Sequence, residues 1–100
     1  MKYIKGQTAR GFDILYFYDD YNEKCDIQRS SSADKNRIWL GTHSANPLIM
    51  ASQTEQGGTG WISYPLPDGI EISHRMHLNR IQSISLALKL LKFGLFNKLK

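Results

Sequence analysis

Hydrophobic and polar residues follow strand-like patterns through the first part of the chain. Residues 12–18, Phe-Asp-Ile-Leu-Tyr-Phe-Tyr, are rich in aromatic and branched side chains, which favour β-strands. The next residues, Asp-Asp-Tyr-Asn at 19–22, have the composition of a tight turn. Residues 24–30 then alternate between apolar and polar side chains, as a strand with one buried face does. These segments predict an antiparallel hairpin.

Shorter apolar runs continue the strand pattern beyond the hairpin, and glycine or proline borders each of them. They lie at residues 37–40, 48–50, 61–64 and 70–73. The first of these runs is closed by Gly41, and three glycines within residues 57–60 indicate a loop. We therefore expect about four to six short strands in total.

One long helix is predicted near the C-terminal end, beginning after Asn79. Asparagine is among the best N-cap residues, and Gln82 stands three positions later, as in a capping box. Apolar side chains then recur at helical spacing, at Ile81, Ile84, Leu88, Leu91 and Leu95. Gly94 is the expected C-cap, so the helix is predicted over residues 79–94.

Together these patterns predict an α+β fold, in which a mostly antiparallel sheet is closed by one amphipathic C-terminal helix. The chain has 100 residues, which is the size of one domain. Its expected parts are an N-terminal extension at 1–10, the sheet at 11–75, the helix at 79–94 and a basic tail at 95–100. Because the helix must cover the apolar face of the sheet, Leu86→Asp or Leu88→Asp is expected to unfold the domain.

The positive charge of the chain is concentrated near its C-terminus. Lys and Arg number 13 and Asp and Glu number 9, for a formal charge of +4, and residues 75–100 hold six basic residues and no acidic one. Such an excess suits an anionic partner, such as a nucleotide, a nucleic acid or an acidic protein surface. A solvated basic face is the simpler interpretation of the same charges.

A single cysteine, Cys25, excludes an internal disulfide framework. We interpret it as a structural side chain, because no positive or histidine neighbour favours a reactive thiolate. The sequence shows no signal peptide and no run of about 18 apolar residues, since Lys89 and Lys92 interrupt the longest candidate. These features predict a cytoplasmic protein with no membrane association.

Cations gather where the predicted helix begins. The positive side chain of Arg80 opposes the helix dipole by a few tenths to about 1 kcal/mol, and no acidic residue from Ser73 onward compensates it. A bound phosphate or carboxylate would do so, because free backbone N–H groups and positive side chains meet at a helix start. In the preceding strand, alternation places Arg75 and His77 on the same face. These three residues are therefore the candidate anion-binding set.

A purely structural role is the alternative for the same residues. Either arginine could pair with a carboxylate of the sheet, the candidates being Asp13, Asp26 and Asp34. His77 could be a satisfied, half-buried imidazole. No catalytic residue, metal site or cofactor is predicted, because the residue spacing matches no zinc site, nucleophile elbow or phosphate-binding loop. An enzyme is therefore the least favoured class.

Several short motifs stand out along the chain, at Ile27-Gln28, Ser30-Ser31, Ile38-Trp39-Leu40-Gly41, Gly60-Trp61, Pro65-x-Pro67 and Arg75-Met76-His77-Leu78-x-Arg80-x-Gln82. Together they resemble a set of short proteins of unassigned function that bacteriophages and prophages widely encode. The resemblance covers roughly residues 20–95. The chain departs from the pattern in residues 1–11 and in the basic tail after Gly94, so neither end inherits anything from it.

The resemblance implies a small phage protein that acts against host defence, and some proteins of that kind sequester cyclic nucleotide signals as oligomers. Combined with the cationic helix start, it suggests a homo-oligomer that captures a phosphate-bearing nucleotide without turning it over. In this hypothesis the arginines bind phosphate, histidine donates a hydrogen bond, tryptophan stacks, and glutamine or serine adds a polar contact. The residues assigned to the ligand are Gln28, Ser31, Trp39, Arg75, His77 and Arg80.

Two other classes of function stay open at this point. An inhibitor of a host nuclease or defence complex predicts a large exposed apolar or charged patch and no closed pocket. A nucleic-acid-binding accessory protein predicts binding that weakens steeply with salt. Its basic stripe would join Lys89, Lys92, Lys98 and Lys100.

Overall fold

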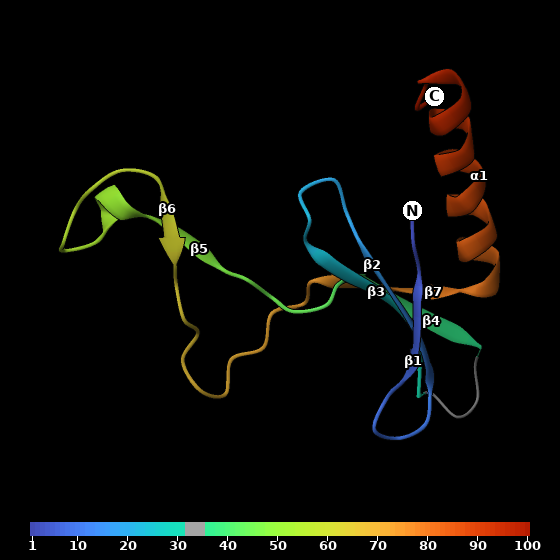
Figure 1. The fold of residues 1–100 in the computed structure, drawn as a ribbon, viewed down its shortest axis with the longest axis horizontal. Helices are drawn as coiled ribbons and strands as arrows, with labels where there is room; N and C mark the ends of the chain where they lie inside the picture. Colours follow the sequence, from blue (N-terminus) through green and yellow to red (C-terminus); the bar gives the residue numbers. More distant parts are fainter. Residues whose placement is uncertain (32–35) are drawn as a thin grey trace. The chain divides into compact units, whose positions relative to one another are not determined.

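Seven β-strands and one α-helix make up the regular structure of residues 1–31 and 36–100, the parts of the chain that the computed structural model describes. The strands are β1 (Ile4–Gln7), β2 (Asp13–Tyr18), β3 (Lys24–Arg29), β4 (Arg37–Thr42), β5 (Leu48–Met50), β6 (Trp61–Ser63) and β7 (Arg75–Asn79). A 3₁₀ turn at Ala51–Gln53 follows β5, and α1 (Arg80–Phe96) follows β7 (Figure 1). The chain therefore has the predicted α+β fold.

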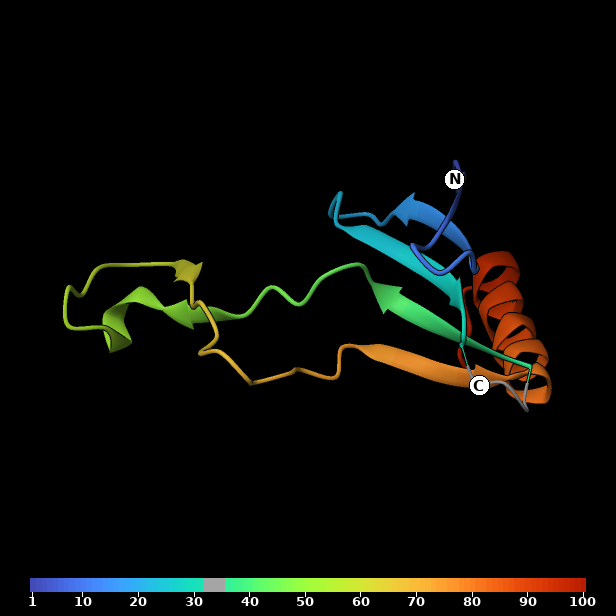
Figure 2. The same ribbon diagram turned by 90° about the horizontal axis from the view of Figure 1, so that it is seen from below.

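The strands form two antiparallel sheets instead of the single sheet expected over residues 11–75. The larger sheet has five strands in the order β1-β2-β3-β4-β7, and Figure 2 shows β2, β3, β4 and β7 side by side. The smaller sheet pairs β5 with β6. The chain accordingly divides into two compact units, one of residues 1–43 and 75–100 and one of residues 44–74.

The predicted hairpin joins β2 to β3 in antiparallel register. In its turn, the Asp19 carboxylate accepts hydrogen bonds from the backbone N–H groups of Tyr21 and Glu23, both at 2.9 Å. Asn22 adopts the left-handed region, with φ of 61°. Short polar side chains suit such turns because they bond to nearby backbone and tolerate positive φ.

Three boundaries differ from those expected. β1 lies inside the expected N-terminal extension, where it pairs with β2. β4 continues through Gly41 to Thr42 instead of ending before the glycine. Residues 70–73 form no strand. β7 begins at Arg75, which pairs with Gly41, and its neighbour β4 ends at the next residue, Thr42. A strand cannot continue where the adjacent backbone offers no hydrogen-bond partner.

Register assigns the side chains of the five-stranded sheet to two faces, because paired residues share a face and successive residues alternate. The polar face carries Asp26, Gln28, Trp39, Gly41, Arg75 and His77. The apolar face carries Leu15, Ile27, Ile38, Leu40, Met76 and Leu78. Arg75 and His77 therefore share a face, as alternation predicts.

α1 begins as predicted but ends later. The Asn79 side chain accepts a hydrogen bond from the Gln82 N–H at 2.8 Å, and the Gln82 side chain accepts one from the Asn79 N–H at 3.1 Å. This reciprocal pair is the predicted capping box. Gly94 lies inside the helix, and the C-cap is instead Asn97, with a left-handed φ of 55°. Asparagine serves here because it tolerates that conformation.

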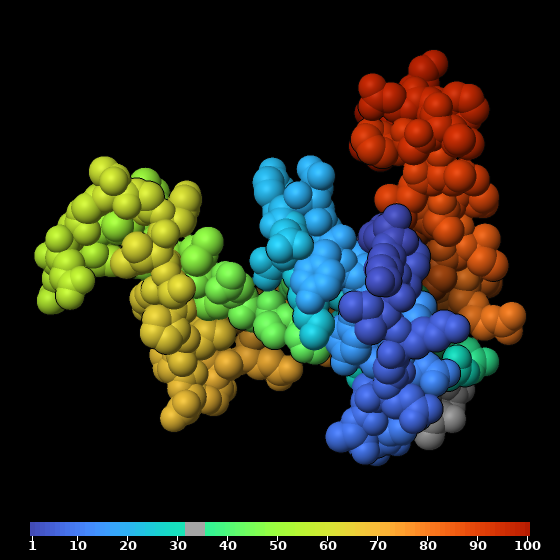
Figure 3. Space-filling model, viewed as in Figure 1, coloured from blue at the N-terminus to red at the C-terminus, as the bar shows by residue number. Residues whose placement is uncertain are grey.

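The apolar stripe of α1 is not buried within one chain, which corrects the expectation for Leu88. No residue of α1 is fully buried, Ser83 and Leu86 are half-buried, and Leu88 is 62% exposed. Figure 3 shows the C-terminal half of α1, in red, uncovered by other segments on the face in view. Among the described residues the fully buried apolar side chains are Ile14, Cys25 and Ala51. A single copy therefore leaves much apolar surface open to water.

Candidate functional site

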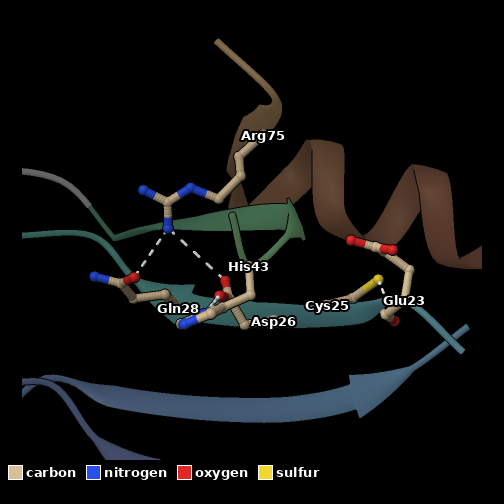
Figure 4. A network of polar contacts seen from close by, with 6 residues as sticks. All are labelled: Glu23, Cys25, Asp26, Gln28, His43 and Arg75. Carbon is tan, nitrogen blue, oxygen red and sulfur yellow. Dashed lines mark hydrogen bonds and ion pairs between the residues drawn. The ribbon is translucent and has the colours of Figure 1, made fainter. Parts of the chain in front are cut away.

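Arg75 is the centre of a polar network on the polar face (Figure 4). Its Nη1 donates a hydrogen bond to Oε1 of Gln28 at 2.9 Å and lies 3.7 Å from Oδ1 of Asp26. Both partners belong to β3, so the arginine side chain crosses β4 to reach them. Gly41 of β4 pairs with Asp26 on one side and with Arg75 on the other, so the three residues form one row across the sheet. Because glycine has no side chain, the row is open for this crossing.

Asp26 is a buried carboxylate with two partners. It is 1% exposed, and its Oδ2 accepts a hydrogen bond from Nδ1 of His43 at 2.8 Å, since a carboxylate oxygen can only accept. Its Oδ1 faces Arg75 as an ion pair but accepts no hydrogen bond from the described residues. Arg75 is therefore partly neutralised within its own chain, as the structural alternative from the sequence proposes.

Trp39 and His77 form a stacked pair in the next row of the polar face. Their ring centroids are 4.0 Å apart, and their planes are inclined by 16°. Nε2 of His77 lies 3.0 Å from Oγ of Ser30, a contact that holds the imidazole ring in orientation. The Arg75 guanidinium carbon lies 5.3 Å from the Trp39 ring centroid, within the range of a cation–π interaction. The cation and the two rings thus form one cluster.

Along β4 and β7 the polar face presents a cation, an aromatic pair and a second cation in successive rows. Arg37 pairs with Asn79, Trp39 with His77, and Gly41 with Arg75. Residues two apart on a strand share a face and are separated by about 6.6 Å. We call Arg37, Trp39, His77 and Arg75 the polar stripe. Its length is about 13 Å along the strands, which is comparable to a nucleotide.

A pocket of about 520 Å³ lies where β3, β4 and β7 meet the first turn of α1, and its lining joins Arg37 of the stripe to Ile38 and Leu78 of the apolar face. Arg29, Arg37 and Arg80 line it, and no carboxylate of the described residues does. Arg29 donates a hydrogen bond to Oδ1 of Asn36 at 3.2 Å, while Arg37 and Arg80 form no ion pair with the described residues. Three guanidinium groups around one hollow favour an anionic ligand.

Comparison with known proteins does not assign the chain to a family. The chain matches no family model, no curated protein and no solved structure. The resemblance to phage-encoded proteins therefore stays a prediction.

The residues assigned to a ligand from the sequence fall into two places. Four of them lie together on the polar face, namely Gln28, Trp39, Arg75 and His77. Arg80 lines the pocket at the helix start instead. Ser31 is exposed and contacts neither group within the described structure, whereas its neighbour Ser30 contacts His77. Asp34, one candidate partner for the arginines, lies outside the described residues.

The structure adds Arg37 and His43, which the sequence does not assign to the site. Alternation was a usable signal for Arg37, because it stands two positions before Trp39 in the same strand. No local signal brings His43 to Asp26, since their contact depends on how β3 and β4 pair.

Cys25 has the properties expected of a structural cysteine. It is 7% exposed, and its Sγ donates a weak hydrogen bond to the Glu23 carbonyl at 3.5 Å. Burial raises the pKa of its thiol above the ordinary value, and the carboxylates of Asp19, Glu23 and Asp26 raise it further. A thiol that resists ionisation is a poor nucleophile and a poor metal ligand.

Two structural features do not occur in the described residues. They contain no group of three or more His, Cys, Asp or Glu side chains placed to hold a metal ion. None of their helices has the length and apolar content that a membrane span requires.

Proposed function

We propose that the protein is a phage-encoded antagonist of host defence, which binds a phosphate-bearing nucleotide signal and sequesters it without catalysis. It acts as a homo-oligomer in the cytoplasm of the host bacterium. The observation that supports the binding role is the polar stripe, in which Arg37 and Arg75 flank the stacked pair of Trp39 and His77. The phage origin and the host target rest on the motif resemblance.

The stripe supplies the groups that nucleotide recognition requires. A base stacks on an aromatic ring such as Trp39, and phosphate oxygens accept paired hydrogen bonds from a guanidinium group. Arg75 is held in place by Gln28 and Asp26, which orient it but also share its charge. Arg37 has no such carboxylate among the described residues and opens on the arginine-lined pocket. Phosphate therefore binds mainly at Arg37 and the pocket, and the base binds at Trp39.

The burial of Ser30, whose hydroxyl group contacts His77, supports binding without turnover. Ser30 lies 3.0 Å from Nε2 of His77, as a nucleophile and base do, but it is only 7% exposed. A buried hydroxyl is closed to an incoming phosphorus atom, and His77 is itself stacked on Trp39. The pair therefore serves to fix the imidazole as a ligand contact.

The proposal is tested with a panel of cyclic dinucleotides, cyclic ADP-ribose isomers, mononucleotides and short DNA. Binding is measured by thermal shift and calorimetry, and the bound compound is then recovered after heat denaturation. We expect one nucleotide class to raise the melting temperature and to be recovered intact. Recovery of a changed compound would instead establish catalysis, and the absence of any shift would remove the nucleotide hypothesis.

Matched variants locate the binding surface. Arg37→Gln and Trp39→Leu each remove one part of the stripe, and we expect at least about a tenfold loss of affinity from either, equal to about 1.4 kcal/mol. Arg10→Gln is the control, because Arg10 lies over the ring of Phe12 and does not line the pocket beside the stripe. Equal loss of affinity in all three variants would indicate nonspecific charge attraction.

Inhibition of a host nuclease or defence complex is the second candidate, because α1 exposes many apolar side chains. A nucleic-acid accessory role is the remaining alternative. It is recognised in the same panel as binding to short DNA that weakens steeply with salt and that depends on Lys89, Lys92, Lys98 and Lys100.

A further inference from the structure

α1 carries an apolar stripe that its own chain does not cover. The stripe consists of Ile81, Ile84, Leu88, Leu91 and Leu95, which are 79%, 63%, 62%, 57% and 66% exposed. The half-buried Leu86 lies on the opposite side of the helix, about 180° from the centre of the stripe at 100° per residue. Leu86 therefore lies on the more buried side of α1, whereas Ile84, near the start of the stripe, lines the pocket together with Ile38 and Leu78.

The spacing of the stripe identifies the kind of surface that covers it. Its residues are separated by three, four, three and four positions, which is the a and d pattern of a helix that packs against another helix. α1 is the only α-helix in the described part of the chain, so a partner helix of this protein comes from a second copy. We propose that α1 pairs with α1 of a second copy through this stripe, which we call the seam.

The size of the seam suits a modest interface. Five aliphatic side chains, each more than half exposed, offer on the order of 500 Å² per copy, and a specific interface needs about 1,000 Å² from two copies together. An exposed apolar patch of this size is often a functional contact surface. A helix of 17 residues is also marginal without a packing partner. Pairing of two copies meets both requirements.

The charges beside the seam predict how pairing responds to salt. Lys92 and Arg80 flank the seam, the neighbouring Ser85 and Ala87 are uncharged, and no acidic residue follows Ser73. Two copies therefore form no ion pairs between their helices and repel each other weakly. Salt screens this repulsion, so the dimer should become tighter as ionic strength rises. A dimer held by ion pairs would respond in the opposite direction.

The seam deepens the proposed homo-oligomer but does not depend on nucleotide binding, so its test uses the ligand-free protein. Sedimentation and light scattering should give the mass of a dimer or a larger assembly. The double variant Leu88→Gln with Leu91→Gln should raise the dissociation constant at least about tenfold, whereas Lys89→Gln, on the polar side of the helix, should leave it unchanged. A monomeric wild type, or a double variant that keeps the wild-type mass, would overturn the seam.

Cysteine cross-linking provides a test that does not require the glutamine variants to fold. In a Cys25→Ala background, Leu88→Cys should form a disulfide-linked dimer on mild oxidation, and Lys89→Cys, on the polar side of α1, should form it at least about tenfold more slowly. Equal rates, or no linked dimer, would overturn the seam. If cross-linking succeeds but no nucleotide binds, the seam stands and the nucleotide hypothesis alone fails.

Discussion

Arg75 reaches Asp26 across the whole width of β4, with Nη1 3.7 Å from Oδ1, and the β4 residue between them is Gly41. Neighbouring strands are about 4.8 Å apart, so the two backbones are separated by roughly 10 Å, which only a long side chain spans. The contact ties β7, an edge strand, to the centre of the sheet. It also orients the guanidinium group beside Trp39.

Gly41→Val should close this crossing. A branched side chain in the row of Asp26 and Arg75 would occupy the space that the guanidinium now uses, and we expect a loss of about 1–3 kcal/mol in the free energy of unfolding. Nucleotide affinity should fall as well, because Arg75 would be displaced from Trp39. Urea denaturation and calorimetry measure the two effects. Thr42→Val places the same side chain on the opposite face of β4. It should change the free energy of unfolding and the nucleotide affinity much less than Gly41→Val does.

Arg75→Met should destabilise the protein even without a ligand. The methionine keeps the aliphatic stem but leaves the buried Asp26 with His43 as its one remaining partner among the described residues. Because the arginine side chain is 28% exposed, we expect a loss of about 1–3 kcal/mol and not the full cost of a deeply buried pair. Urea denaturation of Arg75→Met and of Arg75→Lys checks this. An unchanged midpoint for Arg75→Met would show that the pair contributes nothing to stability.

Leu86→Asp and Leu88→Asp should differ in effect, although the sequence alone predicts that both unfold the domain. Leu86 is half-buried on the side of α1 that contacts its own chain, whereas Leu88 is 62% exposed. We expect Leu86→Asp to lower the free energy of unfolding by about 1–3 kcal/mol. Leu88→Asp should leave a folded monomer. Circular dichroism combined with sedimentation separates loss of fold from loss of assembly, and unfolding of both variants would restore the sequence expectation.

Asn79→Ala should remove the cap of α1. The side chain satisfies the Gln82 N–H group at 2.8 Å, and alanine cannot replace that hydrogen bond. A loss of about 1 kcal/mol is expected from thermal denaturation. Ser85→Ala, an exposed substitution within the same helix, is the control and should leave the melting temperature within experimental scatter.

Cys25 should react slowly with thiol reagents while the protein is folded. Its pKa is raised by burial and by nearby carboxylates, so the folded state favours the protonated thiol. Its contribution to stability is therefore complete below the ordinary thiol pKa and decreases as the pH rises above it. Comparison of wild type with Cys25→Ala in urea, at neutral and alkaline pH, should show their difference shrinking with rising pH. Fast labelling in native conditions would contradict the structural role.

The sequence by itself determined the local elements. The aromatic and branched run at 12–18, the alternation at 24–30 and the capping box at Asn79 each depend on residues within a few positions of one another. Alternation along one strand also places Arg75 and His77 on a common face independently of how the strands pair.

Only the tertiary structure decided which segments lie next to each other. The hydrogen bonds between Arg75 and Gln28 and between His77 and Ser30 each join residues 47 positions apart, and the crossing at Gly41 requires the order β3-β4-β7. The exposure of Leu88 likewise depends on which side of α1 meets the sheet. Periodicity shows that a helix has an apolar side, but the surface that covers that side is set by contacts between distant segments.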